Sequence, residues 1–188
     1  MATVNMTAEI RTDTGKGAAR KIRKGGLVPA VVYRDGNTPS KITIDANDLE
    51  LQFQRIGDPN TLVKIGADGQ SWTCLAREVQ RHPVTQVIRH IDFYEVKEDD
   101  EVTVSVPVET VGRAEGTRMG GALRLIARRM TVVCKPGDIP ATVQVDVTPL
   151  GIGQFIRASK VPAPENTRIV VEHDFNVVTV VGKRGGKK

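Results

Sequence analysis

Short segments that alternate apolar and polar residues recur along the whole chain, and this pattern constrains the fold more than any other feature. The segments are rich in Val, Ile and Thr, and turn signals such as Asp35-Gly36 and Asp68-Gly69 separate them. Because side chains two residues apart share one face of a strand, such alternation indicates strands with one buried face. We therefore predict a mainly β protein, with short helices only where the spacing changes.

The first half of the chain combines strands with two short helices. Strands are expected over residues 3–11, 27–33, 41–48, 61–80 and 87–96, the fourth range holding two strands around a turn. One helix is expected over residues 15–24. A second is expected through residues 49–57, begun by Asp45 or Asn47 as a cap and ended at Gly57. This order predicts a small β-barrel or a strongly curved sheet.

An acidic run from Glu98 to Glu101 interrupts this pattern. Charged breaks of this kind are typical of exposed linkers, so we place a domain boundary there, the alternative being a charged turn inside one domain. The predicted domains cover residues 1–95 and 96–182, followed by a disordered basic tail over residues 183–188.

The second half carries more purely β segments and predicts a sandwich or an open barrel. These segments cover residues 102–109, 123–135, 141–148, 167–173 and 176–183. Residues 112–123 hold four glycines and few apolar side chains, which predicts a long mobile hairpin loop.

Compartment and redox chemistry are constrained by what the sequence lacks. Cys74 and Cys134 match no metal or redox spacing and are expected to be small buried residues. No run of 18 or more apolar residues occurs, and the N-terminus does not have the pattern of a secretory signal. These observations predict a cytoplasmic protein without a membrane span.

The segment GKGAARKIRKGG, residues 15–26, holds five Lys or Arg and no acid, within a chain of net charge +5. At roughly 100° per residue, its cations fall on a helical arc of roughly 160°. These cations are Lys16, Arg20, Lys21, Arg23 and Lys24. The opposite face is small and apolar: Ala18, Ala19 and Ile22.

This charge distribution indicates a polyanion partner. Ordinary solvated faces mix signs, because like charges one helical turn apart repel each other. Gly15 and Gly17 leave backbone N–H groups open near the helix start, which favours a phosphate. A membrane surface is the weaker option, because the apolar face lacks the large side chains that such helices insert.

A second polar cluster lies within residues 80–96, where His90 and Asp92 are spaced to share one strand face. Three interpretations stay open: a catalytic pair, although no motif marks a nucleophile; a metal site with too few ligands; or hydrogen bonding to phosphate, ribose or base. With only one Trp, two Tyr and four Phe, the chain favours duplex backbone and shape over stacking on single strands.

Four motifs together carry a resemblance: GKGA before a basic run, VPAVVY, QRHP and HIDF. With this combination the chain resembles the bacterial large-subunit ribosomal protein twenty-five family, in its longer two-domain CTC (general stress protein) type. The motifs cover residues 7–95, and beyond Val96 the likeness rests on length and an all-β pattern.

The resemblance implies an RNA-binding role in the ribosome. Such proteins bind 5S ribosomal RNA in the central protuberance through a small first-domain β-barrel. The implied RNA-facing residues are Arg11, Lys16, Gly17, Arg20, Lys21, Arg23, Tyr33, Arg81, His82, His90 and Asp92. Neighbouring ribosomal RNA and proteins are further implied partners, whereas enzymatic activity, a metal, a cofactor, a small-molecule substrate and a membrane are not expected.

Two points qualify this expectation. Many family members have Gly after the Tyr of the VVY segment, where this chain has Arg34, a side chain that could add a phosphate contact. The alternative function is a free-standing, stress-related RNA-binding protein that acts off the ribosome.

Overall fold

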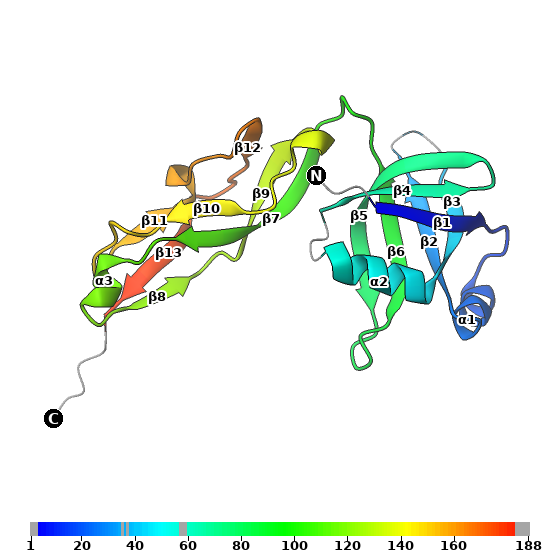
Figure 1. The fold of residues 1–188 in the computed structure, drawn as a ribbon, viewed down its shortest axis with the longest axis horizontal. Helices are drawn as coiled ribbons and strands as arrows, with labels where there is room; N and C mark the ends of the chain where they lie inside the picture. Colours follow the sequence, from blue (N-terminus) through cyan, green and yellow to red (C-terminus); the bar gives the residue numbers. More distant parts are fainter. Residues whose placement is uncertain (1–3, 35, 37, 57–59, 183–188) are drawn as a thin grey trace. The chain divides into compact units, whose positions relative to one another are not determined.

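The computed structural model describes residues 4–34, 36, 38–56 and 60–182. The chain separates into two compact units, Met1–Asp100 and Glu101–Lys188 (Figure 1). Both are built mainly from strands, so the predicted mainly β fold is confirmed. The expected tail, residues 183–188, lies outside the described residues.

The first unit is a closed barrel of six strands in the order β1-β3-β2-β6-β5-β4. These strands are β1 (Val4–Ile10), β2 (Leu27–Tyr33), β3 (Ser40–Asp45), β4 (Leu62–Ala67), β5 (Gln70–Arg81) and β6 (Ile88–Glu95). Strand β1 closes the barrel, since it pairs antiparallel with β3 and parallel with β4. Strand β2 lies between β3 and β6, parallel to β6.

Alternate side chains of these strands fill the barrel with apolar residues. Ile42, Ile65, Ile91 and Phe93 are fully buried, and each such side chain contributes about 1.5–3 kcal/mol by leaving water. Cys74 lies among them as a small buried residue, as predicted.

Two helices lie outside the barrel: α1 (Lys16–Lys24) and α2 (Ala46–Ile56) (Figure 1). Helix α1 ends where the Gly25 N–H donates to the Lys21 carbonyl at 3.1 Å. Helix α2 begins at a predicted cap, because Asp45 Oδ1 accepts from the backbone N–H groups of Asn47 and Asp48 at 2.9 and 3.0 Å. Its expected end at Gly57 lies outside the described residues.

The second unit consists of two sheets, with strand orders β10-β7-β9-β12 and β11-β13-β8. Its strands are β7 (Val102–Val111), β8 (Ala122–Leu125), β9 (Arg129–Cys134), β10 (Val143–Asp146), β11 (Phe155–Arg157), β12 (Thr167–Ile169) and β13 (Asn176–Val181). Its helices are α3 (Glu115–Arg118) and the 3-10 turns η1 (Pro136–Asp138) and η2 (Ala158–Lys160). Residues 123–135, expected as one β segment, are divided between β8 and β9, which belong to different sheets.

The expected loop over residues 112–123 is wrong, because this segment forms the helical turn α3 and leads into β8. The Gly116 N–H donates to the Leu150 carbonyl at 2.8 Å. A Cβ at Gly116 would lie 2.7 Å from the Ile152 nitrogen. Gly116 is therefore needed here because two backbone segments pack closely, and not because the chain is flexible at this point.

Candidate RNA interface

The outer face of α1 carries exposed cations, and its inner face carries small side chains. Lys16, Arg20, Lys21 and Lys24 are exposed, whereas Ala18, Ala19 and Ile22 are half-buried on the side of the barrel. The helix has no acidic residue in its first turn and no side-chain cap. The division of faces expected from the sequence is thus present for four of the five cations.

Arg23 is the fifth cation and lies half-buried at the edge of this face. Its Nε hydrogen goes to the backbone carbonyl of Arg89 in β6, at 2.9 Å. Burial and the neighbouring charges of Arg89 and Arg11 lower the pKa of Arg23 from its usual value. Like charges therefore gather here, and among the described residues none of the three forms an ion pair with a carboxylate.

Arg11 joins this group from the end of β1. Its Nε hydrogen goes to the Ile42 carbonyl at 3.3 Å, and Nη1 donates to the Asp13 carbonyl at 2.9 Å. Both acceptors are neutral, so they fix the guanidinium in place without cancelling its charge. An anion from outside the chain would supply the negative charge that these neutral acceptors lack.

His90 and Asp92 share the outer face of β6, as their spacing predicts. His90 Nδ1 lies 2.7 Å from Asp92 Oδ1, and the two side chains are 23% and 31% exposed. This carboxylate oxygen is shielded from water and has no well-aligned hydrogen bond within the described part of the chain. With Nδ1 facing the carboxylate, His90 presents Nε2 to an outside partner.

Arg81 ends β5, and His82 begins the turn that joins β5 to β6. Arg81 Nη1 donates to Glu50 Oε1 at 3.2 Å and to the Gln86 carbonyl at 3.0 Å. His82 Nδ1 accepts from the N–H groups of Val84 and Thr85, at 3.3 and 3.2 Å. The proton of a neutral His82 therefore sits on Nε2, which is a donor for an external acceptor.

Tyr33 lies at the end of β2, where its ring meets Tyr94 edge-on with centroids 5.6 Å apart. The next residue, Arg34, pairs with Asp100: Nη2 lies 2.9 Å from Oδ2. Asp100 also accepts from the Lys97 N–H at 2.9 Å. Because the Arg34 guanidinium already has a carboxylate partner, this geometry does not favour the phosphate contact considered for it.

The structure adds one cation to those implied by the motifs. Arg89 is exposed beside α1, and with Arg23 and His82 it lines a hollow of about 380 Å³ in the first unit. No local pattern marks this hollow, because it exists only once α1 and the turn over residues 82–87 are both in place. Arg81, the last residue of β5, makes its contacts with Glu50 and Gln86.

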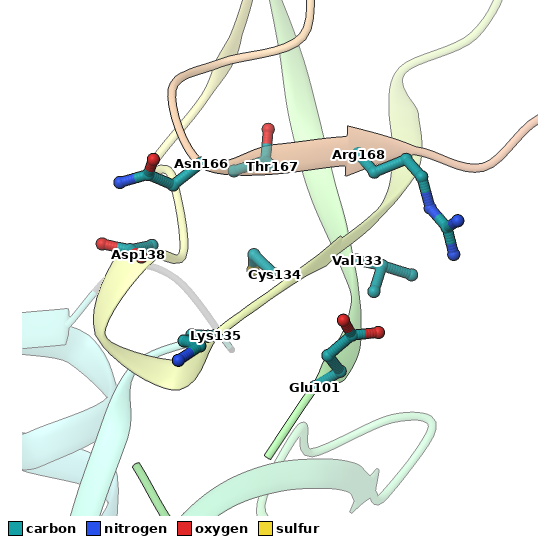
Figure 2. Close-up of a pocket in the computed structure, with 8 residues that line it drawn as sticks. All are labelled: Glu101, Val133, Cys134, Lys135, Asp138, Asn166, Thr167 and Arg168. Carbon is teal, nitrogen blue, oxygen red and sulfur yellow. The ribbon is translucent and has the colours of Figure 1, made fainter. Parts of the chain in front are cut away.

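The second unit has a hollow of about 650 Å³ with mixed charge. Figure 2 shows Asp138 and Asn166 at one end of it and Glu101 and Arg168 at the other. Acidic and basic groups alternate along its wall, so it does not present the single positive sign that a polyanion requires. Cys134, which also lines it, is a buried thiol as predicted.

The described residues give no support to other classes of site. They include no group of three or more His, Cys, Asp or Glu side chains arranged to hold a metal ion. None of the helices in the described ranges has both the length and the apolar character needed to cross a membrane.

A closed six-stranded barrel with a cationic helix on its outer face defines a β-barrel protein with a surface suited to a polyanion. Residues 6–93 match the Ribosomal L25p family, and residues 101–184 match the Ribosomal protein TL5, C-terminal domain. The chain belongs to the Ribosomal L25p family, in its two-domain CTC form, so the resemblance carried by the four motifs is confirmed.

Similar proteins cover nearly the whole chain. Large ribosomal subunit protein bL25 of Halothermothrix orenii is 39% identical over 184 residues, covering 96% of this chain and 83% of the relative. Large ribosomal subunit protein bL25 of Rickettsia rickettsii (strain Sheila Smith) is 32% identical over 185 residues, covering 98% of this chain and 91% of the relative. The bL25 protein of Anaeromyxobacter dehalogenans (strain 2CP-1) is 39% identical over 180 residues, covering 96% of this chain and 75% of the relative.

Membership of this family decides the class of function. The chain is a large-subunit ribosomal protein of the cytoplasmic ribosome, and its family is one of structural ribosomal proteins rather than enzymes. The His90–Asp92 pair is therefore interpreted as a binding element and not as a catalytic one.

Proposed function

We propose that this protein binds 5S ribosomal RNA in the central protuberance of the large subunit, through its predicted first domain, residues 1–95. The single observation that carries this proposal is the cluster of Arg11, Arg23 and Arg89, in which backbone carbonyls hold the first two guanidiniums and none of the three has a carboxylate partner among the described residues. Next to it, α1 presents its exposed cations. Such a surface is complementary to RNA phosphates.

Helix α1 supplies the electrostatic part of the proposed interface. Lys16, Arg20 and Lys21 are exposed and reach outward, so each can contact a phosphate. Gly17 stands near the start of the helix, and a Cβ there would meet nothing within 4 Å, which leaves room for an RNA backbone. Arg11 and Arg23 hold their guanidiniums in fixed positions and add charge that does not depend on long flexible chains.

Strand β6 and its neighbours supply the polar contacts of the proposed interface. A duplex RNA shows ribose hydroxyls and base edges in its shallow groove. His90 can donate or accept there through Nε2. Asp92, which would be repelled by phosphate, can accept from a ribose hydroxyl or a base amino group. Tyr33, Arg81 and His82 complete the proposed set: they lie at the end of β2, at the end of β5 and in the β5–β6 turn.

The experiment is a filter-binding assay of the full chain with labelled 5S RNA. Unlabelled 5S RNA and unlabelled transfer RNA are the two competitors. The proposal predicts that 5S RNA displaces the label at concentrations at least about tenfold lower than transfer RNA does. Equal displacement by both RNAs would reduce the interface to unspecific charge attraction and would overturn the 5S assignment.

A further inference from the structure

The hollow beside Arg23 has the size and the walls of a ligand site. Its volume is about 380 Å³, within the range of about 300–1,000 Å³ that small-molecule sites occupy. It opens between the end of α1, the start of α2 and the β5–β6 turn, all in the first unit.

Backbone hydrogen bonds hold the walls of this hollow. The Gly26 carbonyl accepts from the Ala46 N–H at 3.0 Å, which ties the turn after α1 to the start of α2. Gly26 has a φ of +78°, a conformation that glycine adopts without strain. On the other side, the His82 N–H donates to the Val87 carbonyl at 2.8 Å and closes the turn. The hollow is therefore preformed in the chain without RNA.

The polar wall of the hollow favours an anion. Arg23 is fixed through its Nε hydrogen bond. Its two terminal amino groups have no hydrogen-bond acceptor within the described part of the chain. Arg89 forms no ion pair with the described carboxylates, and His82 offers Nε2 as a donor because Nδ1 is occupied by the turn. Two arginines and one histidine thus line one cavity with no acid among its lining residues.

The remaining wall is apolar. A phosphate alone would make no favourable contact with it. Val28 and Ile88 are buried core residues, Leu27 is half-buried, and Val87 is 54% exposed at the mouth. A ligand that fills this hollow needs both an anionic group and a flat or apolar body. A nucleotide has both, and bases stack on guanidinium planes and imidazole rings in RNA complexes.

We infer that this hollow receives one nucleotide turned out of the bound RNA helix, with its phosphate at Arg23 and Arg89 and its base against the exposed apolar surface of Leu27 and Val87. The inference rests on the proposed binding of 5S RNA and adds a specific contact to it. Turning a base out of its stack costs least at a bulged or mismatched position. The hollow therefore selects an irregular site in the RNA rather than a uniform duplex.

The test compares two exposed valines of the same turn. Val87→Trp fills the mouth of the hollow, whereas Val84→Trp adds the same ring at a position that is 83% exposed and does not line it. Each full-length variant is titrated with 5S RNA, and the bound RNA is probed by 2′-hydroxyl acylation. The inference predicts that Val87→Trp weakens binding about tenfold and that Val84→Trp stays within about twofold.

The probing supplies a second readout. One nucleotide of 5S RNA should change its acylation reactivity on binding wild-type protein, and this change should be lost with Val87→Trp. Arg89→Gln, an exposed substitution outside the core, should lose the same change even if Val87→Trp disturbs folding. Equal weakening by both Trp variants, or unaltered reactivity with Arg89→Gln, would overturn the inference.

The outcomes separate this inference from the proposal beneath it. If wild-type protein does not bind 5S RNA, both fall. If it binds and neither Val87→Trp nor Arg89→Gln alters affinity or reactivity, the proposed function stands and the nucleotide site alone is wrong.

Discussion

Arg23 of α1 donates its Nε hydrogen to the backbone carbonyl of Arg89 in β6, at 2.9 Å, and this bond brings Arg23 within reach of the Arg89 charge. A neutral acceptor holds Arg23 where burial, and then the charges of Arg89 and Arg11, lower its pKa. Folding alone gains little from such an arrangement, whereas a bound phosphate would be stabilised by all three charges. The contact is thus the structural link between the cationic helix and the barrel wall.

Gly17→Ala should separate stability from binding. The new Cβ meets no atom within 4 Å and alanine favours a helix, so the free energy of unfolding should rise by about 0.5–1 kcal/mol. Affinity for 5S RNA should fall at least about tenfold, because the methyl group would occupy the space proposed for the RNA backbone. Urea unfolding and filter binding measure the two effects. Gly137→Ala, also in open space, is the matched control, and equal affinities for both variants would argue against close approach at Gly17.

His90→Ala should weaken binding about tenfold, because one hydrogen bond to RNA and the orientation of Asp92 are both lost. Urea unfolding should change little, since both side chains are partly exposed and lie outside the core. The control is His173→Ala, an exposed histidine of the second unit. A loss of affinity that is the same at both positions would remove His90 from the interface.

Binding should depend steeply on salt. With about six phosphate contacts, the affinity should fall on the order of a thousandfold between 50 and 200 mM monovalent salt, by analogy with duplex DNA. Lys16→Ala should reduce the slope of log affinity against log salt by about one contact. A slope near zero would mean that charge is not the main source of affinity, contrary to the proposed mechanism.

Both thiols should resist alkylation in the folded protein. Burial, with a smaller effect from Glu95, raises the pKa of Cys74 to about 12, and burial together with Asp138 raises that of Cys134. At pH 8 both are therefore protonated and unreactive, and iodoacetamide should label them only after denaturant is added. Stability from the neutral Cys74 thiol is complete below pH 9 and is lost as the pH rises toward 12. Rapid labelling of native protein at pH 8 would contradict their burial.

Gly116→Ala should destabilise the second unit without touching the proposed interface. Its Cβ would lie 2.7 Å from the Ile152 nitrogen and 2.8 Å from Val180 Cγ1, so backbone or side chain must shift, at a cost of about 1–3 kcal/mol. Thermal unfolding followed by circular dichroism measures this loss. Affinity for 5S RNA at 10 °C should stay within about twofold, and a larger fall would extend the interface into the second unit.

Local rules were enough to predict the elements of the first unit. Helical spacing predicts the outward cations of α1, and the position of Asp45 predicts the cap of α2, because each depends on residues within a few positions. The spacing of His90 and Asp92 likewise places them on one strand face.

Long-range contacts were beyond these rules. Closure of the barrel depends on the parallel pairing of Val4 with Val63, which no local pattern encodes. The bond from Arg23 to the Arg89 carbonyl, and with it the hollow, joins residues 66 positions apart. The loop predicted around Gly116 is wrong, because a glycine needed for close packing has the same sequence signature as one in a loop.

The most direct test of the cationic interface is the dissociation constant of the full chain for 5S RNA after removal of two charges from α1. Arg20→Ala/Lys21→Ala should weaken binding about a hundredfold in 100 mM salt, because two phosphate contacts are lost. The matched control, Arg128→Ala/Lys160→Ala, removes two exposed cations from the second unit and should stay within about twofold. If the two double variants lose affinity equally, or if neither loses any, α1 is not the surface that binds the RNA.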